Sequence, residues 1–126
     1  MCKEDPTICV VDNELSICNA LRRLITSAGF NVITYGSAQE FWDDVPTREP
    51  DLLVLDVQMP AMTGLDLQKL LTASGRAIPI VFISARENAM AKSAAMAAGA
   101  VAFFQKPIDE EDLLGVIHKW ISPFQD

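Results

Sequence analysis

Acidic side chains occur in this sequence at points where a run of apolar residues stops. The run Leu52–Leu55 leads directly into Asp56, and the run Ile8–Val11 leads into Asp12 and Asn13. A carboxylate in such a place can act as a nucleophile toward a phosphoryl group. Together with other oxygen ligands it can also bind a hard cation such as Mg²⁺. Each acid taken alone also has a structural interpretation, because Asp is common in turns and at helix starts.

Two further side chains with suitable chemistry follow other apolar runs. Ser84 ends the run Ile80–Ile83, and Lys106 ends the run Ala102–Gln105. A hydroxyl group and an ammonium group can bind phosphoryl oxygens and neutralise the charge that develops during phosphoryl transfer. These residues therefore predict a phosphoryl-transfer site, provided that the runs are strands whose ends meet.

The elements that must position these residues are strand-like runs that alternate with helical patterns. We expect strands at residues 8–11, 32–35, 52–55, 80–83 and 102–105. Parallel strands need helical crossovers, which are right-handed. The sequence therefore predicts an α/β fold, a five-stranded parallel sheet that is doubly wound and flavodoxin-like. We expect strand order 2-1-3-4-5, which puts the ligand crevice between the ends of strands 1 and 3.

The expected helices occupy residues 14–28, a short stretch after Ser37, a stretch around 65–71, residues 87–98, and residues from Asp109 to the end of the chain. Ser37 and Glu40 form an S-x-x-E capping pattern, and Asp109 is a suitable N-cap. The stretch 87–98 has only a weak apolar stripe, which predicts a mobile helix. In the last helix the apolar stripe predicts five buried residues: Leu113, Leu114, Ile117, Trp120 and Ile121.

Composition limits the class of protein. The 126 residues are 50% hydrophobic and 21% charged, which predicts one globular domain over residues 1–126. There is no apolar run of about 20 residues and no signal-peptide pattern, so we expect a cytoplasmic protein without a membrane segment. Cys2, Cys9 and Cys18 lack metal-ligand spacing, which favours reduced thiols, with Cys9 in the core. The net charge of −7 disfavours direct binding of nucleic acid.

Four pieces of the chain, in order, carry a resemblance to a known family. VVDNE, LVLDVQMPAMTG, VFISA and FFQKP resemble the receiver domain of two-component response regulators. MPAMTGLDLQ and AAGAVAFFQKP are most similar to receivers that precede LuxR-type helix-turn-helix domains, in the nitrogen-fixation-regulator branch. The resemblance implies a phosphorelay with a sensor histidine kinase as the partner, Mg²⁺ as the cofactor and transcription as the expected output. It also implies no enzyme activity beyond the domain's own phosphorylation and dephosphorylation.

The same resemblance implies roles for individual residues around the two acids. Asp56 is expected to be the phosphoacceptor. Asp12 and Asn13 occupy the acid-pocket positions, and with Asp56 and the backbone carbonyl of Gln58 they would form the metal site.

A second group of residues is expected to respond to phosphorylation. Ser84 corresponds to the switch hydroxyl, Phe103 to the switch aromatic and Lys106 to the lysine that pairs with the phosphoryl group. The peptide bond from Lys106 to Pro107 is expected to be cis. Phosphorylation would draw the Ser84 hydroxyl inward, Phe103 would fill the space, and the surface of the fourth helix, fifth strand and fifth helix would change. Phe103 as plain core remains the alternative.

One position departs from the family pattern. The family usually has two adjacent acids after strand 1, and the second position here is Asn13. We expect weaker Mg²⁺ binding, because an amide oxygen brings no charge. Glu14 either compensates or faces solvent as an acid in the first helical turn. The alternative function is a degenerate receiver that acts as a phosphorylation-independent interaction module.

Other interpretations of the same sheet fit less well. An aspartate-nucleophile phosphatase would need D-x-D, and Gln58 stands at the second acid. An FMN-binding protein would need a Ser/Thr/Gly-rich loop after strand 1, where Asp12 and Glu14 would repel phosphate. The resemblance leaves open a DNA-binding domain C-terminal to this chain. It also leaves open a homodimer, through the fourth helix, fifth strand and fifth helix or through the first and fifth helices.

Overall fold

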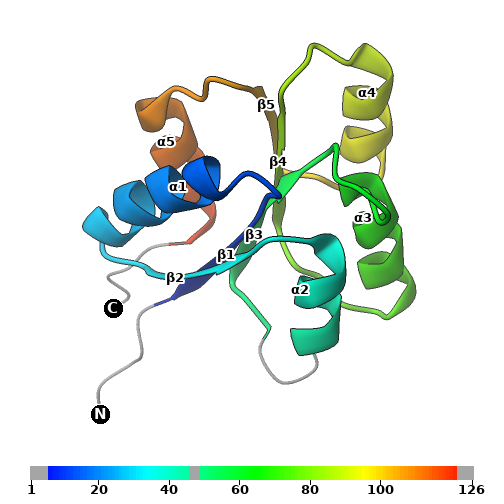
Figure 1. Ribbon diagram of the computed structural model, residues 1–126, viewed down its shortest axis with the longest axis horizontal. Coiled ribbons are helices and arrows are strands. Elements are labelled where there is room, and N and C mark those ends of the chain that lie inside the picture. The colour runs from blue at the N-terminus through cyan, green and yellow to red at the C-terminus, as the bar shows by residue number, and fades with distance from the viewer. Residues whose placement is uncertain (1–5, 46–48, 122–126) are drawn as a thin grey trace.

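The structure, a computed structural model, describes residues 6–45 and 49–121. Strands and helices alternate along this part of the chain (Figure 1). The strands are β1 (Thr7–Val11), β2 (Asn31–Tyr35), β3 (Leu52–Asp56), β4 (Ile80–Ser84) and β5 (Ala102–Gln105). The helices are α1 (Leu15–Ser27), α2 (Ala38–Asp44), α3 (Gly64–Ala73), α4 (Ala89–Ala97) and α5 (Glu110–Trp120).

The strands form one parallel sheet in the order β2-β1-β3-β4-β5. Helices α1 and α5 cover one face, and α2, α3 and α4 cover the other (Figure 1). The predicted fold class and strand order are therefore confirmed. In the register of the central pair, Val11 lies opposite Leu55, so Asp12 and Asp56 follow at the same level of the sheet.

The core explains why the central strands are apolar runs without alternation. Every residue of β3 and β4 is buried, because helices cover both faces of the sheet. Leu53 and Leu55 pack into the cluster beneath α2, α3 and α4, whereas Leu52 and Val54 pack into the cluster beneath α1 and α5. Cys9 is 1% exposed in the first of these clusters, as predicted; Cys2 lies outside the described residues.

The predicted N-caps are present. The Ser37 hydroxyl accepts a hydrogen bond from the Glu40 N–H at 3.1 Å, and the Asp109 carboxylate accepts one from the Asp112 N–H at 3.0 Å. Such caps satisfy backbone donors that have no partner within the helix. They define the starts of α2 and α5.

The predicted start of α4 and the predicted burial of Trp120 were wrong. Helix α4 begins at Ala89 rather than Glu87, because the Asn88 side chain caps it by accepting from the backbone of the third helical residue. Trp120 is 52% exposed, although the apolar stripe predicted burial. It lies in the last turn of α5, at the edge where β4 and β5 begin, and borders a groove with Pro79 and Val101. Protein therefore covers only part of its ring.

The described helices do not include a membrane-spanning candidate, since none of them is long and apolar enough to cross a bilayer.

Candidate phosphoacceptor site

Four predicted site residues lie at the carboxyl edge of the sheet. Asp12 follows β1, Asp56 ends β3, Ser84 ends β4 and Lys106 follows β5. Asp12 and Ser84 are 0% exposed and Asp56 is 3% exposed, so the strands deliver three polar side chains into the interior. Buried polar groups need partners, and these partners determine what the site can do.

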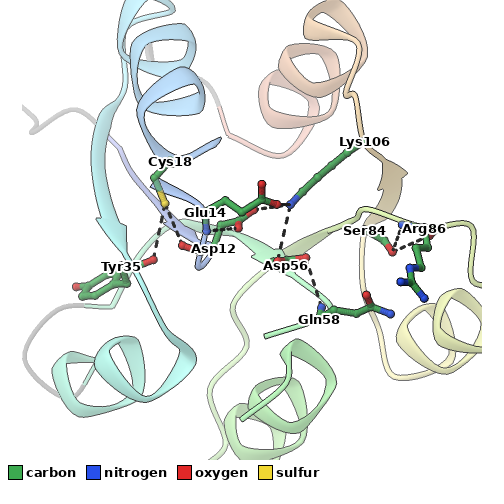
Figure 2. Close-up of polar contacts among 9 residues, drawn as sticks. All are labelled: Asp12, Glu14, Cys18, Tyr35, Asp56, Gln58, Ser84, Arg86 and Lys106. Carbon is green, nitrogen blue, oxygen red and sulfur yellow. Dashed lines mark hydrogen bonds and ion pairs between the residues drawn. The ribbon is translucent and has the colours of Figure 1, made fainter. Parts of the chain in front are cut away.

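Lys106 is the centre of the charged group. Its ammonium nitrogen lies 2.8 Å from Asp12 Oδ2, 3.3 Å from Glu14 Oε1 and 3.8 Å from Asp56 Oδ2. Figure 2 shows the Lys106 side chain extending from the end of β5 toward the carboxylates of Asp12 and Asp56, which lie at the ends of β1 and β3. The Lys106 ammonium therefore balances the charge of several carboxylates. Close contacts are needed to offset the cost of removing these charged groups from water.

Backbone N–H groups hold the two buried carboxylates in place. The Glu14 N–H donates to Asp12 Oδ1 at 2.9 Å, and the Gln58 N–H donates to Asp56 Oδ1 at 3.4 Å. The carboxylate of Asp56 thus meets a backbone donor on one oxygen and the Lys106 ammonium near the other. This orientation leaves Asp56 directed into the space at the sheet edge (Figure 2).

Burial and charge alter the acidity of the group. Burial, together with the negative charge of Asp12, raises the pKa of Asp56 from 3.8 to about 6, although Lys106 acts in the opposite direction. Burial opposes the charged form of Lys106, but the hydrogen bond and the charge of Asp12 outweigh it and raise the lysine pKa. At neutral pH the ionised form of Asp56 therefore carries a cost from burial and from the nearby charge of Asp12.

The donor set fits a divalent cation of the Mg²⁺ type. Repulsion between Asp12 and Asp56 is what a cation relieves, and Mg²⁺ uses few protein ligands while it keeps several waters. Asn13 and Gln58, whose oxygens carry no charge, are both exposed at this edge. Among residues 6–45 and 49–121, no three Asp, Glu, His or Cys side chains converge as a metal cluster. Asp12 and Asp56 are the buried carboxylates that could hold such a cation.

Ser84 is directed toward the loop between β4 and α4. Its hydroxyl donates to the Arg86 carbonyl at 2.7 Å and accepts from the Arg86 N–H at 3.3 Å. Figure 2 shows this pair to one side of Asp56. The structure therefore brings Ser84 to the correct edge of the sheet, but its hydroxyl is occupied by the loop.

Phe103 borders the same loop from β5. The ring is partly buried, and its centroid lies 6.1 Å from that of Phe82. It also lines a cavity of about 400 Å³ with residues of the β4–α4 loop, among them Arg86 and Asn88. Phe103 is thus neither fully buried core nor free surface. The peptide bond between Lys106 and Pro107 is cis.

Gly64 contributes to the site without a side chain. A Cβ atom at this position would lie 2.2 Å from the carbonyl oxygen of Asp56 and 3.1 Å from the Cα of Val57. Its N–H donates to the Val57 carbonyl at 3.0 Å. Gly64 is not among the site residues predicted from the sequence, which also leaves the contact of Glu14 open. A glycine at the start of an otherwise well-capped helix, next to Thr63, is the signal that could have indicated a close backbone approach.

Comparison with known proteins gives a consistent result. Residues 8–118 match the family model of the response regulator receiver domain. The response regulator protein TmoT of Ectopseudomonas mendocina is 42% identical over 114 residues, which cover 90% of this chain and 52% of that protein. The transcriptional regulatory protein TdiR of Thauera aromatica is 38% identical over 112 residues, which cover 89% of this chain and 49% of that protein. The chain spans about half the length of these curated relatives.

Solved structures agree with these matches. The response regulator StyR superposes with a TM-score of 0.85 at 42% identity, over 93% of this chain and 59% of that chain. The structure of FixJ-N gives a TM-score of 0.86 at 29% identity, over 98% of this chain and 99% of that chain. Fold, edge residues and sequence matches lead to one conclusion: the chain belongs to the receiver domains of response regulators in two-component signalling.

Proposed function

We propose that Asp56 accepts a phosphoryl group from the phosphohistidine of a sensor histidine kinase, with Mg²⁺ as the cofactor. The observation that carries the proposal is the arrangement of Lys106, whose ammonium lies between the buried acids Asp12 and Asp56. The proposal includes no enzyme activity other than the domain's own phosphorylation and dephosphorylation.

The residues around Asp56 account for the chemistry. A carboxylate oxygen of Asp56 attacks the phosphorus, and the bond between phosphorus and the donor's leaving group breaks. A pKa of about 6 leaves Asp56 mostly ionised at neutral pH, so the nucleophile needs no separate base. Lys106 moves its ammonium from 3.8 Å away into contact with a phosphoryl oxygen. Bound Mg²⁺ supplies further neutralisation of charge.

The contact between Ser84 and Arg86 provides the step from phosphorylation to a change of surface. A phosphoryl group on Asp56 offers three strong acceptors, so the Ser84 hydroxyl donates to it instead of to the Arg86 carbonyl. The β4–α4 loop then loses a 2.7 Å hydrogen bond. Phe103, which borders the cavity next to this loop, moves inward, and the α4–β5–α5 surface changes.

The output proposed for this switch is transcription, through a DNA-binding domain C-terminal to residue 126. Longer relatives support the proposal: the match covers 49% of TdiR and 25% of NtrC of Klebsiella pneumoniae, and both proteins are named as transcriptional regulators. Within this output class we propose a LuxR-type helix-turn-helix domain, on the phrases MPAMTGLDLQ and AAGAVAFFQKP. A cytoplasmic location and a homodimer, through α4, β5 and α5 or through α1 and α5, belong to the same proposal.

Intact mass tests the phosphoacceptor role directly. The chain is incubated with acetyl phosphate and Mg²⁺ next to the variants Asp56→Asn and Asn13→Asp. We expect a gain of one phosphoryl group in the wild type and in Asn13→Asp, and none in Asp56→Asn. A wild type that gains nothing while Asn13→Asp does would instead support the degenerate receiver, which the exposed neutral residue at position 13 favours.

A further inference from the structure

Glu14 has a contact that its position in the chain does not require. It is the N-cap residue of α1, yet its side chain makes no capping hydrogen bond. Its carboxylate lies instead 3.3 Å from the Lys106 ammonium, across the site from the end of β5. Its N–H also donates to Asp12 Oδ1 at 2.9 Å. Glu14 therefore touches both of the charged residues that neighbour Asp56.

We propose that Glu14 supplies the negative charge that Asn13 does not, and that it acts as the positioning residue for Lys106 when a divalent cation occupies the site. The inference rests on the proposed function, because it concerns the Mg²⁺ that supports phosphorylation of Asp56. It extends that function by assigning a role to a residue outside the family's acid-pocket positions.

The contacts of Lys106 give the physical reason. Its shortest contact is with Asp12, at 2.8 Å, and this carboxylate is also the buried ligand that a cation would use. A cation on Asp12 repels the ammonium, so Lys106 needs another carboxylate close by. Glu14 is that carboxylate, since it is already within 3.3 Å and its side chain is 55% exposed and able to follow the ammonium. Lys106 thereby stays near Asp56 while the cation binds.

Charge gives a second, independent contribution. After β1 this chain has the acid Asp12, then the neutral Asn13 and then the acid Glu14. A negative charge a few ångströms from a divalent cation strengthens binding even without direct ligation. The alternative is that Glu14 is an ordinary acid at a helix start, which the helix dipole stabilises and whose side chain extends into solvent. It does not account for the contact with Lys106.

Calorimetric titration of Mg²⁺ into the unphosphorylated domain tests the inference. We expect Glu14→Gln to weaken Mg²⁺ binding by roughly three- to tenfold at low salt, the effect of one charge near a divalent cation in a largely aqueous setting. Glu49→Gln is the matched control, because Glu49 is an exposed acid that precedes β3 at the opposite edge of the sheet. It should bind Mg²⁺ as the wild type does.

The double variant Asn13→Asp, Glu14→Gln separates charge from structure. It moves the negative charge by one residue and should recover at least the wild-type affinity. An unchanged affinity in Glu14→Gln, a double variant as weak as Glu14→Gln, or a wild type that binds no Mg²⁺ would each overturn the role of Glu14. Residues 13 and 14 are both exposed, and unfolding curves would check that the variants are folded.

Phosphorylation by acetyl phosphate at saturating Mg²⁺ keeps the two proposals distinguishable. If the wild type binds Mg²⁺ but gains no phosphoryl group, the phosphoacceptor proposal fails, and the titrations still decide the role of Glu14. If the wild type is phosphorylated and Glu14→Gln reaches the same extent only at higher Mg²⁺, both proposals are supported.

Discussion

Replacing Asp56 with Asn should stabilise the domain at neutral pH and have little effect in acid. Burial and the charge of Asp12 raise the pKa of Asp56 to about 6 in the folded protein, above its ordinary value of 3.8. A group that holds its proton more tightly in the folded state loses stability when it ionises. The cost is absent below about pH 4, develops between about pH 4 and pH 6, and is complete above that range. Asn carries no such cost at any pH.

The expected gain follows from the size of the shift. A shift of two pKa units corresponds to at most about 3 kcal/mol. Solvent reaches this edge of the sheet, so we reduce the expected gain to about 1–2 kcal/mol at neutral pH. Few contacts offset it, because the Asn oxygen can still accept from the Gln58 N–H, and Lys106 keeps its shorter ion pairs with Asp12 and Glu14.

Urea unfolding in the presence of EDTA, at about pH 8 and about pH 4.5, measures the effect. Asp66→Asn is a control of opposite sign, since hydrogen bonds from the backbone and side chain of Thr63 lower the pKa of Asp66. An acid with a lowered pKa stabilises the fold above its unfolded pKa and loses this as the pH falls through its folded pKa. Asp66→Asn should therefore be less stable than the wild type at the higher pH.

The reasoning is refuted by either of two results. If Asp56→Asn is no more stable than the wild type at the higher pH, ionised Asp56 carries no net cost in the folded protein. If the variant is more stable by the same amount at both pH values, the gain arises from packing and not from the charge. Added Mg²⁺ should stabilise the wild type more than the variant, because only the wild type has the full carboxylate pair.

Three further results are expected from substitutions elsewhere in the site. Gly64→Ala should lower the free energy of unfolding, measured in urea, by about 2–3 kcal/mol or more, because the new Cβ would lie 2.2 Å from a backbone oxygen of β3. Gly115→Ala is the control: the space around Gly115 is open, so the change should stabilise α5 by about 0.5–1 kcal/mol. Lys106→Met should lower the free energy of unfolding by about 3 kcal/mol at neutral pH, since Asp12 would remain buried without its ion pair, and a loss below about 1 kcal/mol would contradict this. Asn13→Asp should tighten Mg²⁺ binding about tenfold in calorimetry; equal affinities would exclude position 13 from the cation site.

The strand ends could be predicted from the sequence because each is marked twice. An apolar run predicts a buried strand, and a polar residue at its end predicts the sheet edge, as Leu52–Leu55 and Asp56 illustrate. Five such units leave few topologies, and the strand order was expected because 2-1-3-4-5 is a common order in doubly wound sheets. The same pattern predicts that Ser84 and Lys106 lie at one edge of the sheet, and both residues are found there.

Side-chain direction could not be predicted in this way. Ser84 lies at the predicted edge, but whether its hydroxyl faces Asp56 or Arg86 depends on the path of the β4–α4 loop, which periodicity does not encode. Glu14 has the pattern of an ordinary acid at a helix start, and only the position of Lys106, 92 residues away in the chain, gives it a partner. Trp120 fits the apolar stripe of α5, but the stripe does not show where the sheet beneath the helix ends.

The surroundings of Asp56 differ in how easily they can move on the α3 side and on the β4 and β5 side. On the α3 side, backbone lies directly against backbone, and even a methyl group would not fit. On the β4 and β5 side, the neighbours are the Lys106 side chain and the β4–α4 loop, which the Ser84 hydroxyl contacts. The Lys106 side chain and the Ser84 hydroxyl can both change rotamer. A group added to Asp56 would therefore displace the β4 and β5 side more easily than the α3 side, where the backbone of Gly64 leaves no room.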